Sequence, residues 1–336
     1  MSITILKPGM MSSLQDLGRW GFQQYGVPIG GAMDKVSAAL ANIICGNDEN
    51  EAVIEMTLHG TSIMFNTETY CAISGGGCKA YIDGVELPFN RLLWIPAFSI
   101  IKTTANLQGC RSYLAVSGGF NVKKIMGSGS TYTPSGIGGI NGRNLITGDM
   151  LAFKREQNLH AASNLHMLPS GVGISHWHTA ALFAATPDVA IVHAIKGPEF
   201  DRFNAASQED IFNSMFTISS RSNRMGYRLE GNKFTLKQKT EMASTAVTTG
   251  IVQVTHEGDP IILMADAQTT GGYPRIARIC AADIPLLAQT RPGVKIRFKE
   301  IIRCHNTHDL FIEMFDTSGR CSIYLRFFIF FLSENF

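Results

Sequence analysis

The fold class follows first from residues 80–87, which read Ala-Tyr-Ile-Asp-Gly-Val-Glu-Leu. An Asp-Gly pair between two short β-forming runs is a strong signal for a hairpin with a two-residue turn. Further runs of β-branched and aromatic residues, separated by turn-forming residues, surround this hairpin: Val53–Thr57, Ser62–Phe65, Tyr70–Ser74, Arg91–Ile95, Ser99–Lys102, Arg111–Val116 and Met150–Phe153. Short strands at this spacing favour sandwiches and barrels over a doubly wound α/β sheet.

Helix is expected to be the minority state. Apolar residues from Val36 to Ile44 repeat at helical spacing, and Asp34 can cap the helix that they predict. A helical stretch is predicted at Phe200–Asn213, and a short helix near Asp283–Gln289, where Asp283 could serve as the cap. The second half otherwise repeats the strand pattern, at Val189–Ile195, Phe216–Ser219, Ile251–Val254, Ile261–Met264 and Val294–Phe298. The sequence therefore predicts a mainly β fold with a few short helices.

The two strand-rich sets are separated by a segment without clear periodicity. From Arg155 to about Ser175, Gly, Ser, Asn and His accumulate, so we place a domain boundary there. We expect one β-rich domain over residues 1–175, a second over 176–310, and an atypical apolar tail over 311–336. The run Tyr324–Leu332 is too short to span a bilayer and is predicted to be a buried last strand.

Composition limits the classes of partner. Apolar residues make up 45% of the chain and charged residues 17%, which suits a compact globule. Lys+Arg 29 nearly balances Asp+Glu 27, and no basic cluster predicts a nucleic-acid partner. The seven cysteines form no Cys-x-x-Cys pair, so we expect free thiols and a reducing compartment. With no secretory signal and no apolar run near the length of a spanning helix, we expect a cytoplasmic protein without a membrane partner.

Nucleotide and serine-hydrolase motifs fail. Gly127–Thr131 is glycine-rich but is not followed by the Lys of a phosphate loop, and Gly136–Asn141 is not a dinucleotide fingerprint. We predict tight turns at both places, although a backbone nest that binds an anion stays open. The chain has no Gly-x-Ser-x-Gly elbow, so a serine triad is unsupported.

Metal binding is not expected. His176 and His178 could lie on one strand face, and Cys304, His305 and His308 are close in sequence. Neither group is accompanied by a carboxylate-rich motif with the spacing of metal ligands. Surface or loop histidines are the preferred interpretation, and we predict no metal site.

One polar segment stands out in the second half. Residues 266–274 read Asp-Ala-Gln-Thr-Thr-Gly-Gly-Tyr-Pro and directly follow the apolar run Ile261–Met264. Two hydroxyls, an amide and a carboxylate beside a Gly-Gly turn could surround a small polar ligand. The alternative is a well hydrogen-bonded turn, and only its position in a loop at a strand end favours a functional role.

This segment also carries a resemblance to a known family. The chain resembles the family of the 5-oxoprolinase C subunit, also described as biotin-dependent carboxyltransferase-like or allophanate hydrolase subunit 2. The resemblance runs in order from about Ile3 to Phe298, through Leu14–Asp34, Arg111–Phe120, Gly127–Tyr132, Gly139–Asp149, Lys196–Phe203, Ser222–Leu229, Gly250–Asp266 and Ala265–Gly293. It departs at Gly129, Asn223 and Thr255, where the family usually has Arg, Asp and Pro, and beyond Ile302.

The resemblance implies two cyclophilin-like β-barrel domains and a shared activity. In the family, the C subunit joins subunits B and A to open 5-oxoproline to glutamate at the expense of ATP, used with Mg. Because the sequence shows no phosphate loop, nucleophile elbow or convincing metal site, we expect the chain alone to be inactive. Two alternatives remain: a carboxyltransferase module of a biotin-dependent, urea amidolyase-like enzyme, and a non-catalytic antagonist of a histidine-kinase inhibitor. Neighbouring genes for subunits A and B, or for a biotin carboxylase, would distinguish the two enzymes.

Transfer of a phosphoryl or carboxyl group needs donors aimed at developing negative charge. Arg224 and Arg111 are the candidates, because a guanidinium fork matches a carboxylate or phosphate. A structural salt bridge is the alternative for both. Asp266 could position such a donor or act as a base.

The remaining candidates would bind substrate. Gln268, Thr269, Thr270 and Tyr273 are expected to line the pocket and orient the lactam. The N-terminal block adds Asp16, Arg19 and Asp34. Asp16 and Arg19 could pair with each other across one turn, whereas capping of the helix is the preferred role for Asp34.

Overall fold

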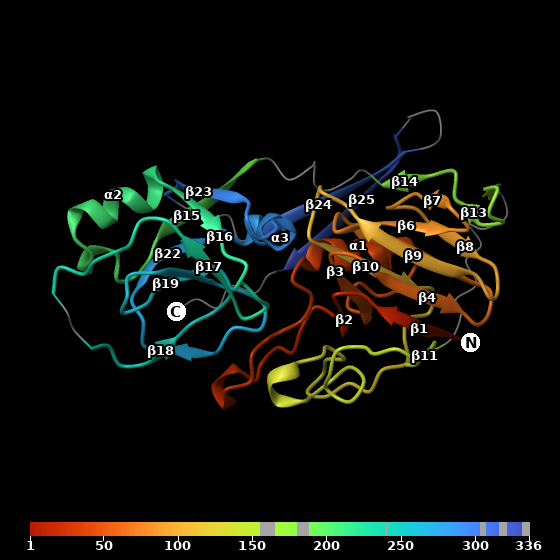
Figure 1. Ribbon diagram of the computed structural model, residues 1–336, viewed down its shortest axis with the longest axis horizontal. Coiled ribbons are helices and arrows are strands. Elements are labelled where there is room, and N and C mark those ends of the chain that lie inside the picture. The colour runs from red at the N-terminus through yellow and green to blue at the C-terminus, as the bar shows by residue number, and fades with distance from the viewer. Residues whose placement is uncertain (155–164, 180–187, 239–240, 303–306, 316–320, 331–336) are drawn as a thin grey trace. The chain divides into compact units, whose positions relative to one another are not determined.

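The computed structural model describes residues 1–154, 165–179, 188–238, 241–302, 307–315 and 321–330, the last two ranges as backbone only. The chain divides into two compact units, each discontinuous in sequence. Unit 1 comprises Met1–Gly18, Asp34–Ala185 and Leu310–Phe327, and unit 2 comprises Arg19–Met33, Thr186–Asp309 and Phe328–Phe336. Strands dominate both units (Figure 1), so the predicted mainly β fold is confirmed.

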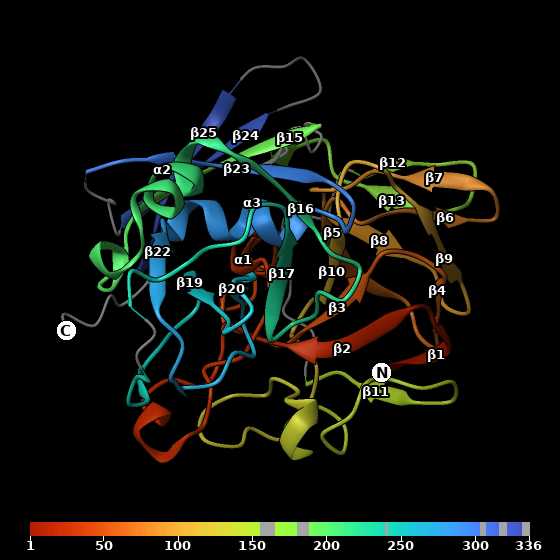
Figure 2. The ribbon, with the colours of Figure 1, turned by 60° about the vertical axis from the view of Figure 1, so that its left-hand side comes forward.

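Unit 1 contains a six-stranded sheet in the order β11-β1-β4-β9-β6-β7, visible side by side in Figure 2. Its strands are β1 (Ser2–Pro8), β4 (Thr61–Phe65), β6 (Cys78–Ile82), β7 (Val85–Leu87), β9 (Ile100–Ala105) and β11 (Met150–Ala152). The predicted hairpin joins β6 to β7. Asp83 and Gly84 have φ values of 49° and 81°, the left-handed pair that a primed hairpin turn requires.

A seven-stranded sheet, ordered β12-β13-β8-β5-β10-β3-β2, completes the framework of unit 1. Its strands are β2 (Met11–Gln15), β3 (Val53–Thr57), β5 (Thr69–Gly75), β8 (Leu93–Ile95), β10 (Arg111–Val116), β12 (His166–Met167) and β13 (Gly173–Ile174). Ile5 and Phe65 of the first sheet share one buried apolar cluster with Leu14, Ile54 and Leu114 of the second. The two sheets therefore enclose a common core.

Helix α1 (Lys35–Ile44) packs on β5 and β10 of the seven-stranded sheet. Asp34 caps it, because its Oδ1 accepts the backbone N–H of Ser37 at 3.0 Å and its Oδ2 accepts the Ser37 hydroxyl at 2.6 Å. Both the predicted helix and the preferred capping role of Asp34 are confirmed.

Unit 2 is built on a closed barrel in the order β15-β22-β19-β20-β17-β16-β23. The strands are β15 (Val189–Lys196), β16 (Met215–Ile218), β17 (Gly226–Glu230), β19 (Ile251–Val254), β20 (Pro260–Leu263), β22 (Arg275–Ile279) and β23 (Lys295–Glu300). Among the barrel pairings of the described chain, only that of β15 with β23 is parallel. Val192, Phe216, Ile262 and Phe298 lie in its buried core.

The helices of unit 2 follow the predictions with one correction. The stretch Phe200–Asn213 is a 3₁₀ turn followed by α2 (Ala205–Asn213), and Asn204 caps α2. Helix α3 (Ile284–Gln289) forms as predicted, but the cap assigned to Asp283 is wrong. The Asp283 carboxylate instead accepts the backbone N–H of His193 at 2.5 Å and lies 2.9 Å from the Nδ1 of that residue.

The remaining strands form two small sheets. Strand β18 (Thr245–Ala246) pairs with β21 (Thr270–Gly271), and β14 (His178–Thr179), β24 (Thr307–Phe315) and β25 (Cys321–Phe330) form a three-stranded sheet. The run predicted as a last strand, Tyr324–Leu332, lies in β25 as far as Phe330, and residues 331–332 are outside the described part. Its predicted burial concerns side chains outside the described part.

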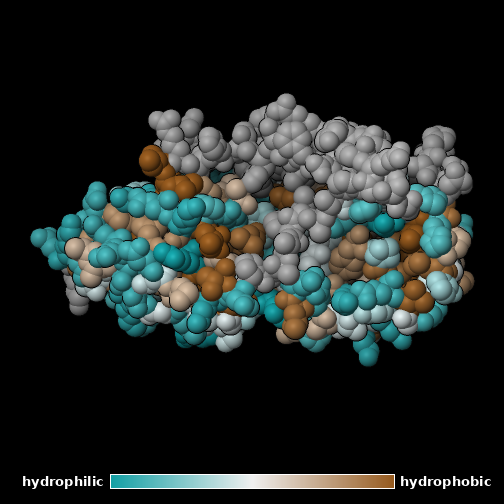
Figure 3. Space-filling view, turned by 90° about the horizontal axis from the view of Figure 1, so that it is seen from above, coloured by the Kyte–Doolittle hydropathy of each residue, from teal (hydrophilic) through white to brown (hydrophobic). Residues whose placement is uncertain are grey.

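The described surface is mixed in character. Ile191 of β15 and Met215 of β16 are more than half exposed, and both are register partners of Arg297. Figure 3 likewise shows hydrophobic residues scattered among hydrophilic ones. None of the described helices is both long and apolar enough to cross a bilayer.

The cysteines depart in part from the expectation of free thiols. Cys45, Cys71, Cys78 and Cys110 form no disulfide and are buried in unit 1, whereas Cys280 of unit 2 is disulfide-bonded. Burial raises the pKa of Cys78 to about 11, against a smaller opposing effect of the Ser112 hydroxyl. The thiols of Cys45 and Cys71 have pKa values raised by burial as well.

Candidate functional site

A row of buried polar side chains crosses one face of the seven-stranded sheet of unit 1. The antiparallel register places Ser13 of β2 opposite Glu55 of β3, Glu55 opposite Tyr113 of β10, and Tyr113 opposite Ser74 of β5. Directly opposed residues point to the same face, so these four side chains form one line. Each is at most 3% exposed. We call Ser13, Glu55, Tyr113 and Ser74 the polar row.

Hydrogen bonds connect the polar row to the start of α1. The Tyr113 hydroxyl donates to Oε2 of Glu55 at 2.9 Å and accepts the backbone N–H of Asp34 at 2.8 Å. The Ser74 hydroxyl donates to the carbonyl of Ser37. Burial, and then the nearby charges of Glu55 and Asp34, raise the pKa of Tyr113 well above its usual range. The phenol therefore remains a proton donor at neutral pH.

Arg111, a predicted catalytic residue, lies on the same face of β10 as Tyr113. Its Nε is 4.0 Å from Oε1 of Glu55, and both side chains are buried. The ion-pair alternative raised from the sequence is therefore present, with the guanidinium and the phenol both next to one carboxylate.

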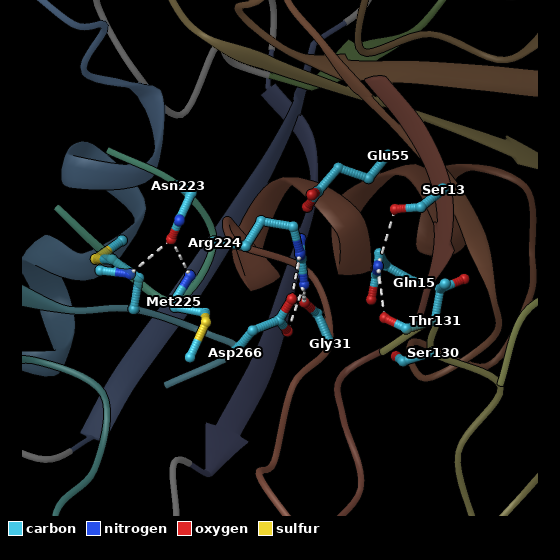
Figure 4. Close-up of polar contacts among 12 residues, drawn as sticks. Ser13, Gln15, Gly31, Glu55, Ser130, Thr131, Asn223, Arg224, Met225 and Asp266 are labelled. Carbon is cyan, nitrogen blue, oxygen red and sulfur yellow. Dashed lines mark hydrogen bonds and ion pairs between the residues drawn. The ribbon is translucent and has the colours of Figure 1, made fainter. Parts of the chain in front are cut away.

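Gln15 extends the polar surface at the end of β2, as Figure 4 shows. Its Nε2 donates to the Ser13 hydroxyl at 2.9 Å and to the carbonyl of Thr131 at 3.2 Å. Gln15 is 1% exposed, and its Oε1 is buried without a hydrogen-bond donor. Sequence reasoning did not select this residue.

Asp16 fills the glycine-rich turn that resembled a phosphate loop. Its carboxylate accepts the hydroxyls of Ser128 at 2.7 Å and Ser130 at 2.5 Å, and the backbone N–H groups of Gly18 at 2.8 Å and Gly129 at 2.6 Å. The anion nest left open from the sequence is real, and the anion is the chain's own carboxylate. Substrate binding by Asp16 remains a proposal. A substrate group would have to replace one or more of these four hydrogen bonds to reach the carboxylate.

Unit 2 brings together two of the predicted catalytic residues. Arg224 donates from Nε to Oδ2 of Asp266 at 2.8 Å and from Nη2 to Oδ1 at 3.0 Å. The same Nη2 donates to the carbonyl of Gly31 at 2.6 Å (Figure 4). Strands β17 and β20 pair at Gly226 and Leu263, so the loops that carry the two residues are adjacent. The result is a buried bidentate ion pair.

Arg19 approaches the same pair within unit 2. It is fully buried, and its backbone N–H donates to the carbonyl of Ile29 at 2.7 Å. A Cβ on Gly30 would lie 3.5 Å from Oδ1 of Asp266 and 3.9 Å from Nη1 of Arg19, and Gly30 has a φ of +63°. A Cβ would make only ordinary contacts there, so the positive φ, and not a lack of space, favours glycine. The suggested pairing of Arg19 with Asp16 joins residues of different units and stays a prediction.

The polar segment after β20 is organised by a residue that the sequence analysis missed. Gln253 of β19 is 1% exposed. Its Oε1 accepts the Nε2 of Gln268 at 3.3 Å, and its own Nε2 donates to the carbonyl of Tyr273 at 3.3 Å. A buried glutamine in an otherwise apolar strand was the available signal. The segment is therefore a hydrogen-bonded turn whose side chains are still accessible in part.

The other predicted residues of this segment differ in exposure. Thr270 is exposed on β21, and Thr269 is partly buried, with its carbonyl accepting the N–H of Val247 at 2.9 Å. The ring of Tyr273 meets that of His256 edge to face, with ring centroids 5.2 Å apart. Their role in binding substrate remains a proposal.

Two departures from the family pattern have a local structural account. The Oδ1 of Asn223 accepts the N–H groups of Met225 at 2.8 Å and Gly226 at 3.2 Å, which are bonds that an aspartate could also accept. Thr255 donates its own N–H to the carbonyl of Asp259 at 3.0 Å, a bond that proline could not make.

A second bidentate pair in unit 2 was also missed. Arg275 of β22 donates to Glu199 from Nη2 at 2.6 Å and from Nε at 2.8 Å. Burial raises the pKa of Glu199, but the hydrogen bonds and charge of Arg275 outweigh it, so the pKa lies below its usual range. This pair offers a matched comparison for Arg224 and Asp266.

No group of three or more His, Cys, Asp or Glu side chains suited to a metal occurs among the described side chains. His178 instead has Nδ1 at 3.3 Å from Nη2 of Arg91. Burial, and then the charge of Arg91, lower the pKa of His178. Cys304, His305 and His308 lie outside the described side chains.

Comparison with known proteins extends over most of the chain. Residues 25–300 match the model of the family described as "Carboxyltransferase domain, subdomain A and B". The chain is 39% identical over 296 residues to the 5-oxoprolinase C subunit of Escherichia coli, covering 88% of this chain and 90% of that protein. The corresponding protein of Haemophilus influenzae is 37% identical over 299 residues, covering 89% and 91%.

A solved structure agrees with this assignment. The crystal structure of the K. lactis urea amidolyase superposes with a TM-score of 0.79 at 29% identity, covering 88% of this chain and 18% of that one. The similarity therefore concerns one part of a much longer enzyme. Together, these matches show that the chain belongs to the carboxyltransferase domain family, subdomains A and B.

Proposed function

We propose that this chain is the C subunit of an ATP-dependent 5-oxoprolinase, which opens 5-oxo-L-proline to L-glutamate together with subunits A and B. The observation that carries the proposal is the identity of 39% over 90% of the length of a protein named as the C subunit of 5-oxoprolinase. The match thus spans nearly the whole of that relative, whereas the urea amidolyase match involves one part of a larger chain.

The reaction needs activation, because a lactam carbonyl is a poor electrophile. Transfer of the terminal phosphoryl group of ATP to the lactam oxygen would turn that oxygen into a leaving group. Water then attacks the carbon, and the C–N bond breaks as the ring nitrogen takes a proton, which leaves an acyl phosphate. A second water hydrolyses this acyl phosphate to the carboxylate and free phosphate. Negative charge develops on oxygen in these steps, so an oriented guanidinium would stabilise them.

Arg224 is the donor that we assign to this task. The two bonds that Arg224 donates to Asp266 and the one that it donates to the Gly31 carbonyl fix the plane of the guanidinium. Asp266 is then a positioning residue, which we favour over its alternative role as a base. Arg111, next to Glu55 in unit 1, is the second candidate. The partly exposed Gln268, Thr269, Thr270 and Tyr273 would contact the substrate.

ATP and its Mg are assigned to the complex rather than to the glycine-rich turn of this chain. The donors of that turn, including the Gly129 N–H and the Ser128 and Ser130 hydroxyls, already bind the Asp16 carboxylate. A phosphate placed there would have to displace an internal anion. This use of the donors also supports a chain that is inactive without its partners.

The test is reconstitution followed by substitution. The chain should co-purify with subunits A and B, and ATP-dependent release of glutamate from 5-oxoproline should appear only in the complex. In that complex, Arg224→Lys should lower turnover roughly a hundredfold or more, because lysine keeps the charge but loses the oriented fork.

Arg275→Lys is the matched control. It breaks the bidentate pair with Glu199 in the same unit, so it should lower the melting temperature while turnover per folded molecule stays near wild type. Equal losses of turnover in the two variants would remove Arg224 from the catalytic role. A reconstituted wild-type complex without activity would refute the function itself.

A carboxyltransferase module is the second candidate. It is favoured by the TM-score of 0.79 with a urea amidolyase and by the name of the family. Under this alternative, a biotinylated partner would deliver the carboxyl group, and the same Arg224 would face a carboxylate instead of a phosphoryl group. If labelled bicarbonate is transferred to urea only when a biotinylated carrier is present, and 5-oxoproline is not opened, the carboxyltransferase alternative is supported.

A further inference from the structure

We propose that Ser13 and Gln15 of β2 form a recognition site for a cis-amide or ureide group, in which an N–H and a C=O lie side by side. The lactam of 5-oxoproline and the urea molecule both have this chemistry. For the lactam, the inference rests on the proposed function, whereas for urea it stands without it. The two residues would be positioning residues for the substrate.

The first observation is an unused acceptor. The amide nitrogen of Gln15 is committed to Ser13 Oγ and to the Thr131 carbonyl, which also fixes the identity of its two ends. Its Oε1 is therefore held in a defined direction, buried and without a donor. An unsatisfied buried acceptor costs about 1–3 kcal/mol, so a ligand N–H that reaches it would recover that cost.

The second observation is an unused donor on the same face of the strand. Ser13 Oγ accepts the bond from Gln15, and its hydroxyl proton has no acceptor among the described residues. Ser13 is 3% exposed. Because side chains two positions apart on a strand point the same way, Ser13 offers a donor beside the acceptor of Gln15.

The acceptor is also rigidly supported. Thr131, which holds the Gln15 nitrogen, donates its own N–H to the Leu14 carbonyl at 2.9 Å and its hydroxyl to the same carbonyl at 3.0 Å. Both hydrogen bonds of the Gln15 amide nitrogen thus lead back to its own strand, one through Ser13 and one through Thr131. Such preorganisation is typical of a binding group and is not needed for a surface amide.

A donor beside an acceptor matches one arrangement of ligand atoms. The ligand N–H donates to Gln15 Oε1 while the ligand C=O accepts the Ser13 hydroxyl. A cis amide, as in a five-membered lactam, or urea presents both atoms on one edge, whereas L-proline has no carbonyl on its ring. The site should therefore distinguish 5-oxo-L-proline from L-proline.

The experiment measures binding of 5-oxo-L-proline, urea and L-proline by calorimetry, to the full chain alone and to its complex with subunits A and B. The variants are Ser13→Ala and Gln15→Met. Ser12→Ala is the control: it lies on the same strand and the opposite face, and its hydroxyl donates to the Pro8 carbonyl at 2.6 Å. All three variants lose buried hydrogen bonds, and their melting temperatures report that loss.

We expect Ser13→Ala and Gln15→Met to weaken binding of 5-oxo-L-proline or urea roughly ten- to a hundredfold, as loss of a buried hydrogen-bond partner predicts. Ser12→Ala should bind like wild type, and L-proline should bind to none of the proteins. In the active complex, the same two substitutions should raise KM more than Ser12→Ala does at equal folded fraction.

Three outcomes would overturn the inference: unchanged binding in both variants, an equal loss in Ser12→Ala, or no binding of either probe to wild type in either state. The proposed function would survive the first two if the wild-type complex turns over 5-oxoproline. Conversely, Ser13-dependent binding of urea by a chain whose complex does not open 5-oxoproline would support the site and refute that function.

Discussion

The two faces of the seven-stranded sheet of unit 1 are built by the same strands and are equally buried, yet they differ in chemistry. On one face, Leu14, Ile54, Leu114 and Ile73 follow one another in register across β2, β3, β10 and β5. One residue away along each strand lies the polar row of Ser13, Glu55, Tyr113 and Ser74. No residue of either row is more than 3% exposed.

We assign the two faces different roles: the apolar face stabilises the fold, and the polar face serves function. The apolar row belongs to the core cluster of unit 1, and its burial stabilises the fold. Burying a carboxylate, a phenol and hydroxyls has no comparable benefit, because each group loses water and must find a partner. We therefore propose that this buried polar row serves binding or catalysis rather than folding.

The largest expected effect on the free energy of unfolding comes from a cavity on the apolar face. Leu114→Ala should lower the free energy of unfolding by about 2–5 kcal/mol, from lost transfer energy and the cavity left behind. Denaturant unfolding measures this loss, and turnover per folded molecule in the complex should stay near that of wild type. A stable variant with impaired turnover would reverse the roles of the two faces.

A smaller effect on stability is expected from the polar face. Tyr113→Phe removes the hydroxyl between the Asp34 N–H and Glu55, so unfolding should become easier by about 1–3 kcal/mol. In contrast to Leu114→Ala, turnover per folded molecule should also fall.

The control for this substitution is Tyr81→Phe. Tyr81 also donates to a glutamate, Glu86, at 3.2 Å, but on the exposed side of unit 1. Its loss should change neither stability nor turnover measurably. If Tyr113→Phe retains full turnover, the polar row has a structural role only.

The smallest effect concerns thiol chemistry on the apolar face. Cys71 of β5 lies on the same face as Ile73, and burial raises its pKa above the usual range. Raising the pH from 7 to 9 converts much of an ordinary cysteine thiol, as in the unfolded chain, to thiolate. A buried thiol with a raised pKa stays almost entirely protonated over the same range. Alkylation of Cys71, followed by mass spectrometry, should therefore accelerate only in denaturant. Rapid labelling in the native protein would show that this face opens.

Much of the fold followed from local patterns. The Asp83-Gly84 hairpin, the strands around it and the Asp34-capped helix all rest on turn chemistry or periodicity within a few residues. Asp283 shows the limit of such reasoning. Its carboxylate accepts a hydrogen bond from His193, 90 residues away in sequence. Local capping rules consider only nearby residues and cannot predict such a distant partner.

The candidate site was predictable only in part. Asp266 was selected from the polar segment at a strand end and Arg224 for its guanidinium. The pairing of β17 with β20 explains their meeting, which no spacing rule implies. Gln15, Glu55 and Tyr113 were missed because each lies inside a strand, where a single polar residue fits an exposed position as well as a buried one. Only the register of the sheet and the burial of that face distinguish the two cases.

The nest around Asp16 also bears on how the protein is made. Its ligands on Ser128 and Ser130 lie 112 and 114 residues further along the chain. At ribosomal rates of about 5–20 residues per second, roughly 6–23 s pass between synthesis of Asp16 and synthesis of its last partner. During that interval Asp16, which directly follows the edge strand β2, lacks the partners that hold it in the folded protein. We therefore expect nascent chains stalled before residue 128 to bind chaperones, and chains stalled well beyond residue 130 to release them.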